Sequence, residues 1–122
     1  LYSWDMPFKE RIELVAREVY GADGVDFSAE ASRKLADIQK RDDANELGLC
    51  MVKTHLSLSD DPGVKGAPKG WKLRIRGVLT FGGAGFVVPV SGSITLMPGT
   101  GSNPSFRRVD VDVDTGRVKG IF

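Results

Sequence analysis

Apolar residues in the first twenty positions recur at the spacing of one helical face. The residues of this stripe are Phe8, Ile12, Val15 and Val19. They are separated by four, three and four positions, which predicts an amphipathic helix with the stripe facing the core. Asp5 is placed to cap this helix, and Pro7 fits its first turn. Gly21 or Gly24 is placed to end it in the left-handed conformation.

A second helix is predicted from Ser28 to about Lys40. Ser28 is a favourable N-cap residue, and Ala31, Leu35 and Ile38 fall on one face with charged residues on the other. The two predicted helices therefore each present one apolar face to a common core.

After residue 46 the apolar period changes from helical to extended. Trp71, Leu73 and Ile75 alternate with cationic residues, as in a half-buried strand. Further short apolar or alternating runs are 47–52, 86–90, 93–97 and 109–113, and 117–122 is placed to pair back on the last of these. Ser-Gly between the runs 86–90 and 93–97 suggests a hairpin. The chain is therefore predicted to be one α+β domain over residues 1–122, with two N-terminal helices packed on a mixed or antiparallel sheet of about five strands.

Composition narrows the class of protein. The chain has 122 residues, 41% hydrophobic and 27% charged, with a net charge of +1. This near-balance favours neither a nucleic acid nor a membrane partner. No apolar run reaches the length of a membrane span, and no signal peptide opens the chain. Cys50 is the single cysteine, and its apolar neighbours predict a buried thiol and a cytoplasmic protein.

Three stretches resemble ligand loops but lack the residues that define such loops. The aspartates of 110–116 would need a glycine where Thr115 stands and a glutamate where Ile121 stands to form an EF-hand, so they favour the wet face of an edge strand. The glycines of 82–85 and 99–102 are not followed by the Lys and Ser/Thr of a P-loop, which favours a bulge or close backbone approach.

The polar segment KTHLSLSDDPGVKGAPKGW, residues 53–71, fits both a ligand-binding role and a purely structural one. Hydroxyl groups and two carboxylates could orient a purine or a ribose, and they could equally supply hydrogen bonds to turns. His55 is the only histidine, which excludes a histidine metal cluster. Lys53 and Lys69 lie in loops for which the sequence shows no fixed partner. No catalytic set and no metal-ligand set is predicted.

The chain contains, in this order, LYSWDMPFKERIELVAREVYGADGVDFSAEA, CMVKTHLSLSDDP, GAPKGW, GAGF, ITLMPG, RVDVD and GIF. These stretches resemble, in order and spacing, the C-terminal end of formate–tetrahydrofolate ligases (10-formyltetrahydrofolate synthetases). The resemblance covers residues 1–122. Ala67, Lys69 and Trp71 depart from the family's GRPTGF, residues 43–50 from its GFGNLPIC-like segment, and residues 100–101 from its MPGLP.

The resemblance implies an ATP- and magnesium-dependent ligase of one-carbon metabolism and purine biosynthesis. In that family formate attacks the γ-phosphate of ATP, and tetrahydrofolate captures the formyl group from formyl phosphate. The phosphate-binding loop lies in an N-terminal portion that this sequence lacks. The chain alone is therefore expected to be inactive and to bind no cofactor tightly, and the complete enzyme is expected to form homo-oligomers.

The resemblance also implies a nucleotide-facing role for the polar segment. The residues expected to border the nucleotide are Thr54, Ser57, Ser59, Gly66, Pro68, Gly70 and Trp71. The missing initiator Met predicts that the chain is cut from a longer one. The alternatives are a stand-alone binding module of the same fold and a subunit of a split ligase. The sequence does not distinguish a monofunctional parent from one fused to dehydrogenase and cyclohydrolase domains.

Overall fold

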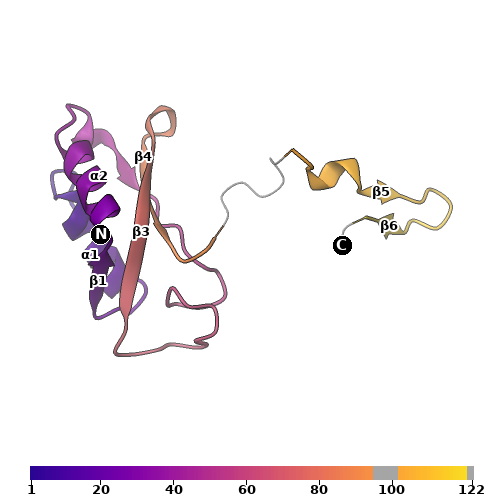
Figure 1. The fold of residues 1–122 in the computed structure, drawn as a ribbon, viewed down its shortest axis with the longest axis horizontal. Coiled ribbons are helices and arrows are strands. Elements are labelled where there is room, and N and C mark those ends of the chain that lie inside the picture. The colour runs from indigo at the N-terminus through magenta and orange to yellow at the C-terminus, as the bar shows by residue number, and fades with distance from the viewer. Residues whose placement is uncertain (95–101, 121–122) are drawn as a thin grey trace.

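The computed structural model describes residues 1–94 and 102–120. The helices and longer strands are α1 (Phe8–Glu18), β1 (Gly24–Phe27), α2 (Ala29–Gln39), β3 (Lys72–Phe81) and β4 (Phe86–Ser91). The shorter strands are β2 (Gly48–Leu49), β5 (Asp110–Val111) and β6 (Val118–Lys119), and 3₁₀ turns occur at Ala44–Glu46, Gly82–Ala84 and Ser105–Arg107. In Figure 1 both helices lie on the same side of β3. No helix in the described ranges is long and apolar enough to cross a membrane.

The main sheet is mixed. Its strand order is β1-β3-β4-β2, with β1 parallel to β3, β2 parallel to β4, and β3 antiparallel to β4. The predicted α+β class is therefore confirmed, with four strands in this sheet and β5 and β6 in a second, two-stranded one. The sequence pattern missed β1, which lies between the two helices rather than after them. The four residues of β1 are too few to show the alternation of a strand, and its partner strand β3 lies almost fifty positions later.

Helix α1 begins differently from the prediction. Pro7, not Asp5, occupies the N-cap position, and no side chain of the N-cap residue caps the helix. The N–H of Phe8 instead donates to Oε1 of Gln39 at 2.9 Å, so the end of α2 satisfies a first-turn donor of α1. The Asp5 prediction was wrong because a distant glutamine supplies the acceptor.

The buried face of α1 is also rotated from the predicted stripe. Phe8 and Ile12 are buried as predicted, but Val19 is 54% exposed and Ala16 takes the next buried position. The helix ends at Glu18, and Gly21 follows with a φ of 72° and an N–H that donates to the Arg17 carbonyl at 3.1 Å. Gly21 therefore serves as predicted, whereas Gly24 opens β1.

Arg11 lies at the centre of the N-terminal packing and is fully buried. Its Nε donates to the Met6 carbonyl at 2.6 Å, its Nη1 donates to the Leu47 carbonyl at 2.8 Å, and its Nη2 donates to the Trp4 carbonyl. The Phe8 ring lies 4.3 Å from its guanidinium carbon. Three carbonyls and an aromatic face thus replace water around this cation, and they fix residues 4–6 against the start of β2.

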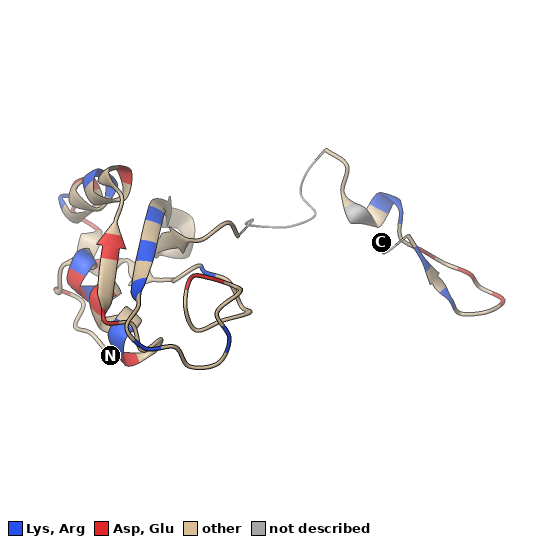
Figure 2. Cartoon of the chain, turned by 60° about the horizontal axis from the view of Figure 1, so that its bottom comes forward, with Lys and Arg blue, Asp and Glu red and all other residues tan. Residues whose placement is uncertain are grey.

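Helix α2 and strand β3 match their predictions closely. Oγ of Ser28 accepts the N–H of Ala31 at 3.0 Å, and Ala31, Leu35 and Ile38 are buried. In β3, Leu73 and Ile75 are buried between exposed cationic residues, which form the blue bands in Figure 2. A register shift between Ile75 and Gly77 then returns Val78 to the core side.

Three further predictions, on Cys50, on the pairing of β4 and on the C-terminal hairpin, have different outcomes. Cys50 is exposed, because it follows the two-residue strand β2 and the neighbouring Leu49 and Met51 are the side chains that pack on the core. β4 pairs with β3 and β2, and the predicted hairpin of β4 with 93–97 cannot be compared because residues 95–97 lie outside the described residues. The hairpin near the end is present as β5 and β6, with Val111 opposite Val118.

Candidate functional site

The segment 53–71 connects the β2 region to β3 without helix or strand of its own. Its start is fixed to the sheet, because the N–H of Val52 donates to the Pro89 carbonyl at 2.9 Å and the Val52 carbonyl accepts from Ser91 at 2.8 Å. Its end is fixed by Trp71, whose carbonyl accepts the N–H of Asp23 at 2.8 Å. A long polar loop is thus held at both ends by the main sheet.

Lys53 points into this loop rather than toward solvent. Its Nζ donates to the Thr54 carbonyl at 2.8 Å and to the Ser57 carbonyl, and it lies 5.0 Å from the centre of the Tyr20 ring. Burial lowers the pKa of Lys53, and the charge of Asp60 partly opposes this effect. Lys53 therefore has fixed partners that the sequence did not reveal, and it organises the turn that carries the hydroxyl groups.

The hydroxyls of Ser57 and Ser59 are engaged within the loop. Oγ of Ser57 accepts the N–H of Ser59 at 3.0 Å, lies 2.9 Å from Oγ of Ser59, and donates to the Val64 carbonyl. Oγ of Ser59 also accepts the N–H of Asp61 at 3.1 Å. Thr54 makes a simpler local bond, in which its Oγ1 accepts the N–H of Leu56 at 3.2 Å. These contacts are the turn-stabilising bonds that the sequence left open beside a ligand role.

Asp60 anchors the middle of the segment to β3. Its Oδ2 accepts from Nε of Arg74 at 2.7 Å, and it is 8% exposed. The hydrogen bond that Arg74 donates to Asp60, reinforced by the charge of Asp60, raises the pKa of Arg74. The bond spans fourteen positions and sets where the loop turns relative to the sheet.

Two glycines with positive φ shape the second half of the segment. Gly66 and Gly70 have φ of 76° and 73°, a region that favours glycine, and a Cβ at either would meet nothing within 4 Å. Trp71 is half-buried and packs on the core, and its Nε1 donates to the Pro68 carbonyl at 3.1 Å. The indole N–H thereby has the partner that a buried tryptophan requires.

A cavity of about 230 Å³ opens beside the first half of the segment. Its lining residues are Thr54, His55, Leu56, Asp60, Pro62, Ser93 and Ile94. Of the residues predicted to border a nucleotide, Thr54 alone lines it. The Gly66–Trp71 turn lies outside this lining, so the structure places the predicted site residues in two groups along one loop. Leu56, Pro62 and Ile94 were not predicted, since isolated apolar residues in a loop give no periodic signal.

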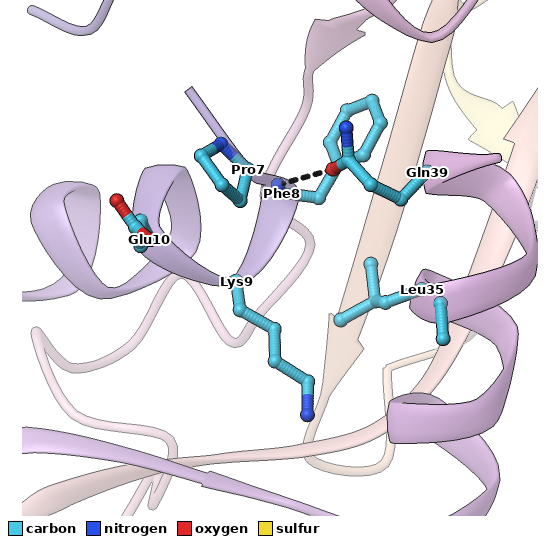
Figure 3. Close-up of a pocket in the computed structure, with 7 residues that line it drawn as sticks. Pro7, Phe8, Lys9, Glu10, Leu35 and Gln39 are labelled. Carbon is cyan, nitrogen blue, oxygen red and sulfur yellow. Dashed lines mark hydrogen bonds between the residues drawn. The ribbon is translucent and has the colours of Figure 1, made fainter. Parts of the chain in front are cut away.

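A second hollow, of about 340 Å³, lies between α1 and α2 (Figure 3). Pro7, Phe8, Leu35 and Ala36 give it an apolar lining, and Lys9, Glu10 and Gln39 stand at its margin. None of the residues predicted for a site lines it. In residues 1–94 and 102–120, no group of three or more His, Cys, Asp or Glu side chains is placed to hold a metal ion.

The fold and the loop define a mixed α+β unit with an ordered, glycine-containing polar segment at one end of its sheet. Comparison with known proteins places that unit in a family. The family model for formate–tetrahydrofolate ligase matches residues 1–122, and the chain belongs to this family.

Individual relatives agree with the family match. Formate–tetrahydrofolate ligases of Desulforapulum autotrophicum and Lawsonia intracellularis are each 68% identical to the whole of this chain, and one from Dehalococcoides mccartyi is 57% identical. The 122 residues cover 100% of this chain but 20–21% of each of these relatives. The chain thus spans about a fifth of the length of the ligases it matches.

Proposed function

We propose that this chain is the C-terminal part of an ATP-dependent ligase that forms 10-formyltetrahydrofolate from formate and tetrahydrofolate. The observation that carries the proposal is the family match over all 122 residues, together with 68% identity to ligases about five times as long. No observation favours the alternative of a stand-alone binding module.

The proposed reaction has two steps. A formate oxygen attacks the γ-phosphorus of ATP, ADP leaves, and formyl phosphate forms. The N10 amine of tetrahydrofolate then attacks the formyl carbon, and inorganic phosphate leaves as the amine loses a proton. Positioning and charge neutralisation dominate catalysis of phosphoryl transfer, and magnesium accompanies ATP in such reactions. We assign the phosphate loop, the magnesium site and the catalytic side chains to the part of the ligase outside this chain.

Within this scheme the segment 53–71 forms one wall of the nucleotide cleft. The hydroxyls of Ser57 and Ser59 hold the turn, because their hydrogen bonds are made inside the loop. The backbone at Gly66, Pro68 and Gly70 is the part presented outward, since these residues have no long side chain to shield it. Thr54, at the cavity, and Trp71, at the end of the turn, complete the wall.

The remaining features of the proposal concern the whole enzyme. It works in the cytoplasm in one-carbon metabolism and purine biosynthesis, and it assembles as a homo-oligomer. Its partners are ATP, formate and tetrahydrofolate rather than a nucleic acid or a membrane, in line with the net charge of +1.

Replacement of Gly66 by valine in the full-length ligase tests the nucleotide wall. A Cβ at a φ of 76° forces the turn to shift, and a branched side chain then stands where the backbone would approach the base. We expect the KM for ATP to rise by about tenfold, which corresponds to about 1.4 kcal/mol of binding. The turnover number and the KM for formate should change much less.

Gly116→Val is the matched control. Gly116 has a φ of 68° and open space around it, but it lies in the turn between β5 and β6. The two variants thus carry the same backbone strain at different places. Ligase activity with an ATP dependence that is equal in the two variants would remove the 66–71 turn from the nucleotide site.

A further inference from the structure

The side of the main sheet that faces away from the helices carries an apolar surface. In the register of β3 and β4, Leu79 stands opposite Val88 and Phe81 opposite Phe86. Val78 and Val87, which alternate with these residues, belong to the core under the helices. We call this side of β3 and β4 the outer face; it carries Leu79, Phe81, Phe86 and Val88, of which Phe81 and Phe86 are exposed and Val88 is buried. Figure 1 shows both helices on one side of β3.

The outer face is apolar where a solvent-facing sheet would be polar. Strand β4 reads FVVPVS, so it has no polar side chain before Ser91 on either face. An antiparallel pair with one wet face alternates apolar and polar residues, whereas a strand covered on both faces reads as a continuous apolar run. Phe81 and Phe86 are nevertheless 46% and 43% exposed. The sequence of β4 is therefore that of a strand with a second covering layer.

Cationic side chains outnumber acidic ones along the border of the outer face, where Glu30 of α2 also lies. Lys72, Arg74 and Arg76 occupy the exposed positions of the first half of β3. A hollow of about 370 Å³ adjoins the apolar part, and it is lined in part by Glu30, Lys34, Arg76, Leu79, Val90 and Ile94. Lys72 and Arg74 pair with Asp26 and Asp60, whereas Nη2 of Arg76 donates to the Ile94 carbonyl at 3.5 Å. A partner that meets this border is suited by a carboxylate.

We propose that a segment of the rest of the same ligase polypeptide covers the outer face, with apolar side chains on Phe81 and Phe86 and a carboxylate beside Arg76. The proposal rests on the proposed function, since it takes this chain to be part of the longer enzyme. About four-fifths of each matched relative lies outside the residues that this chain matches, which is ample to supply a covering layer.

A second copy of this chain fits the face less well. A two-fold contact brings the same surface of both copies together, so the cationic border of one copy would meet that of the other. Like charges opposed at an interface disfavour association. A different segment that carries an acidic residue avoids this repulsion.

Hydroxyl-radical footprinting of the full-length ligase without nucleotide tests the proposal. The modification rates of Phe81 and Phe86 are measured by mass spectrometry and compared with the rates of the same residues in the denatured protein. Phe8, which is 1% exposed, is the internal standard for a buried phenylalanine. We expect Phe81 and Phe86 to be protected as strongly as Phe8.

In the Arg76→Glu variant the modification of Phe81 and Phe86 should become several-fold faster. The control variant Arg108→Glu, at an exposed arginine outside the main sheet, should leave the rates unchanged.

Four results would overturn the inference. Phe81 and Phe86 modified at nearly half the denatured rate would show an open face. Loss of protection when the enzyme is diluted to the monomer would show that a second copy covers the face. Protection that appears only after ATP is added would show that the ligand covers it. Unchanged rates in Arg76→Glu would remove the acidic partner. A ligase assay on the same sample separates the two proposals, since an active enzyme with a reactive Phe81 refutes the covering and leaves the function standing.

Discussion

Nε of Arg74 lies 2.7 Å from Oδ2 of Asp60, and this bond joins strand β3 to the middle of the polar segment 53–71. The two side chains differ in environment, since that of Asp60 is 6% exposed and that of Arg74 is 69% exposed. The carboxylate is thus covered by the loop, and the guanidinium approaches it from the solvent side. Because Asp60 follows Ser59 directly, the bond also holds the hydroxyl network in place.

Asp60→Asn should therefore loosen the loop without unfolding the sheet. The amide keeps the shape of the carboxylate but removes the charge that attracts Arg74, and charge-assisted bonds are stronger than neutral ones. We expect amide hydrogen exchange across residues 57–66 of the full-length ligase to become several-fold faster, with exchange in β3 and β4 nearly unchanged. Asp114→Asn, at an exposed position of the β5–β6 turn, is the control. Equal exchange in the two variants would show that the Asp60–Arg74 bond does not order the loop.

The rotated face of α1 gives a prediction that separates the structure from the sequence pattern. Ile12 is fully buried, and Val19 is 54% exposed although it belongs to the predicted stripe. Ile12→Ala should lower the opening free energy of α1 by about 2–5 kcal/mol, the usual range for a buried aliphatic side chain cut to alanine. Val19→Ala should change it by no more than about 0.5 kcal/mol, as at other exposed positions.

Native-state hydrogen exchange in the full-length protein measures both values, because it reports the opening of one helix rather than global unfolding. A large loss in Val19→Ala would support the sequence-based stripe over the structure.

These residues also show where the sequence was informative. The local signals of α2 and β3 were read correctly, namely the Ser28 cap, the buried face of α2 and the alternation of β3 up to Ile75. Features that depend on residues far away in the sequence were not predicted. Gln39 replaces Asp5 as the acceptor at the start of α1, and β1 exists because β3 pairs with it.

The candidate site shows the same contrast between local signals, which the sequence carries, and distant contacts, which it does not. The sequence identified a polar, glycine-containing loop with serine hydroxyls that could hold turns, and the structure shows those bonds at Ser57 and Ser59. It did not show that Lys53 turns inward to two carbonyls, or that Leu56 and Ile94 line a cavity. Contacts across a loop depend on its three-dimensional path, for which a single sequence has no periodic signal.

The β5–β6 hairpin should respond to acid through Asp112. Its Oδ2 accepts from Nζ of Lys119 at 2.8 Å, and its Oδ1 accepts the N–H of Thr115 at 3.0 Å. The hydrogen bond from Lys119, followed by those from Thr115, lowers the pKa of Asp112 below its ordinary value of 3.8. A depressed folded-state pKa stabilises the hairpin fully above the unfolded pKa, and this contribution is lost as the pH falls through the folded value.

A carboxyl titration by NMR checks the sign of this effect. In the wild-type protein the Asp112 carboxyl should titrate below pH 3.8, and in Lys119→Gln its pKa should rise toward 3.8. Lys69→Gln, which removes a lysine from a different loop, should leave the titration of Asp112 where it was. A Lys119→Gln variant with an unshifted Asp112 would show that the 2.8 Å bond is not formed in solution.

The purified 122-residue chain should have no formate–tetrahydrofolate ligase activity, even when circular dichroism and hydrogen exchange show it to be folded. Phosphoryl transfer needs cations, backbone donors and metal held around the transferring group, and correct positioning can be worth about 7–11 kcal/mol of barrier. In the described part of this chain no acidic or histidine cluster is placed for a metal, and the ammonium of Lys53 is already bonded to two carbonyls. Weak nucleotide binding can survive, since contact with the base requires only one wall of the cleft.

The assay supplies ATP, magnesium, formate and tetrahydrofolate and follows 10-formyltetrahydrofolate, with the full-length ligase as the positive control. Turnover by the short chain that persists through repurification and disappears in Gly66→Val would place catalytic groups within these 122 residues and overturn the division of labour proposed above.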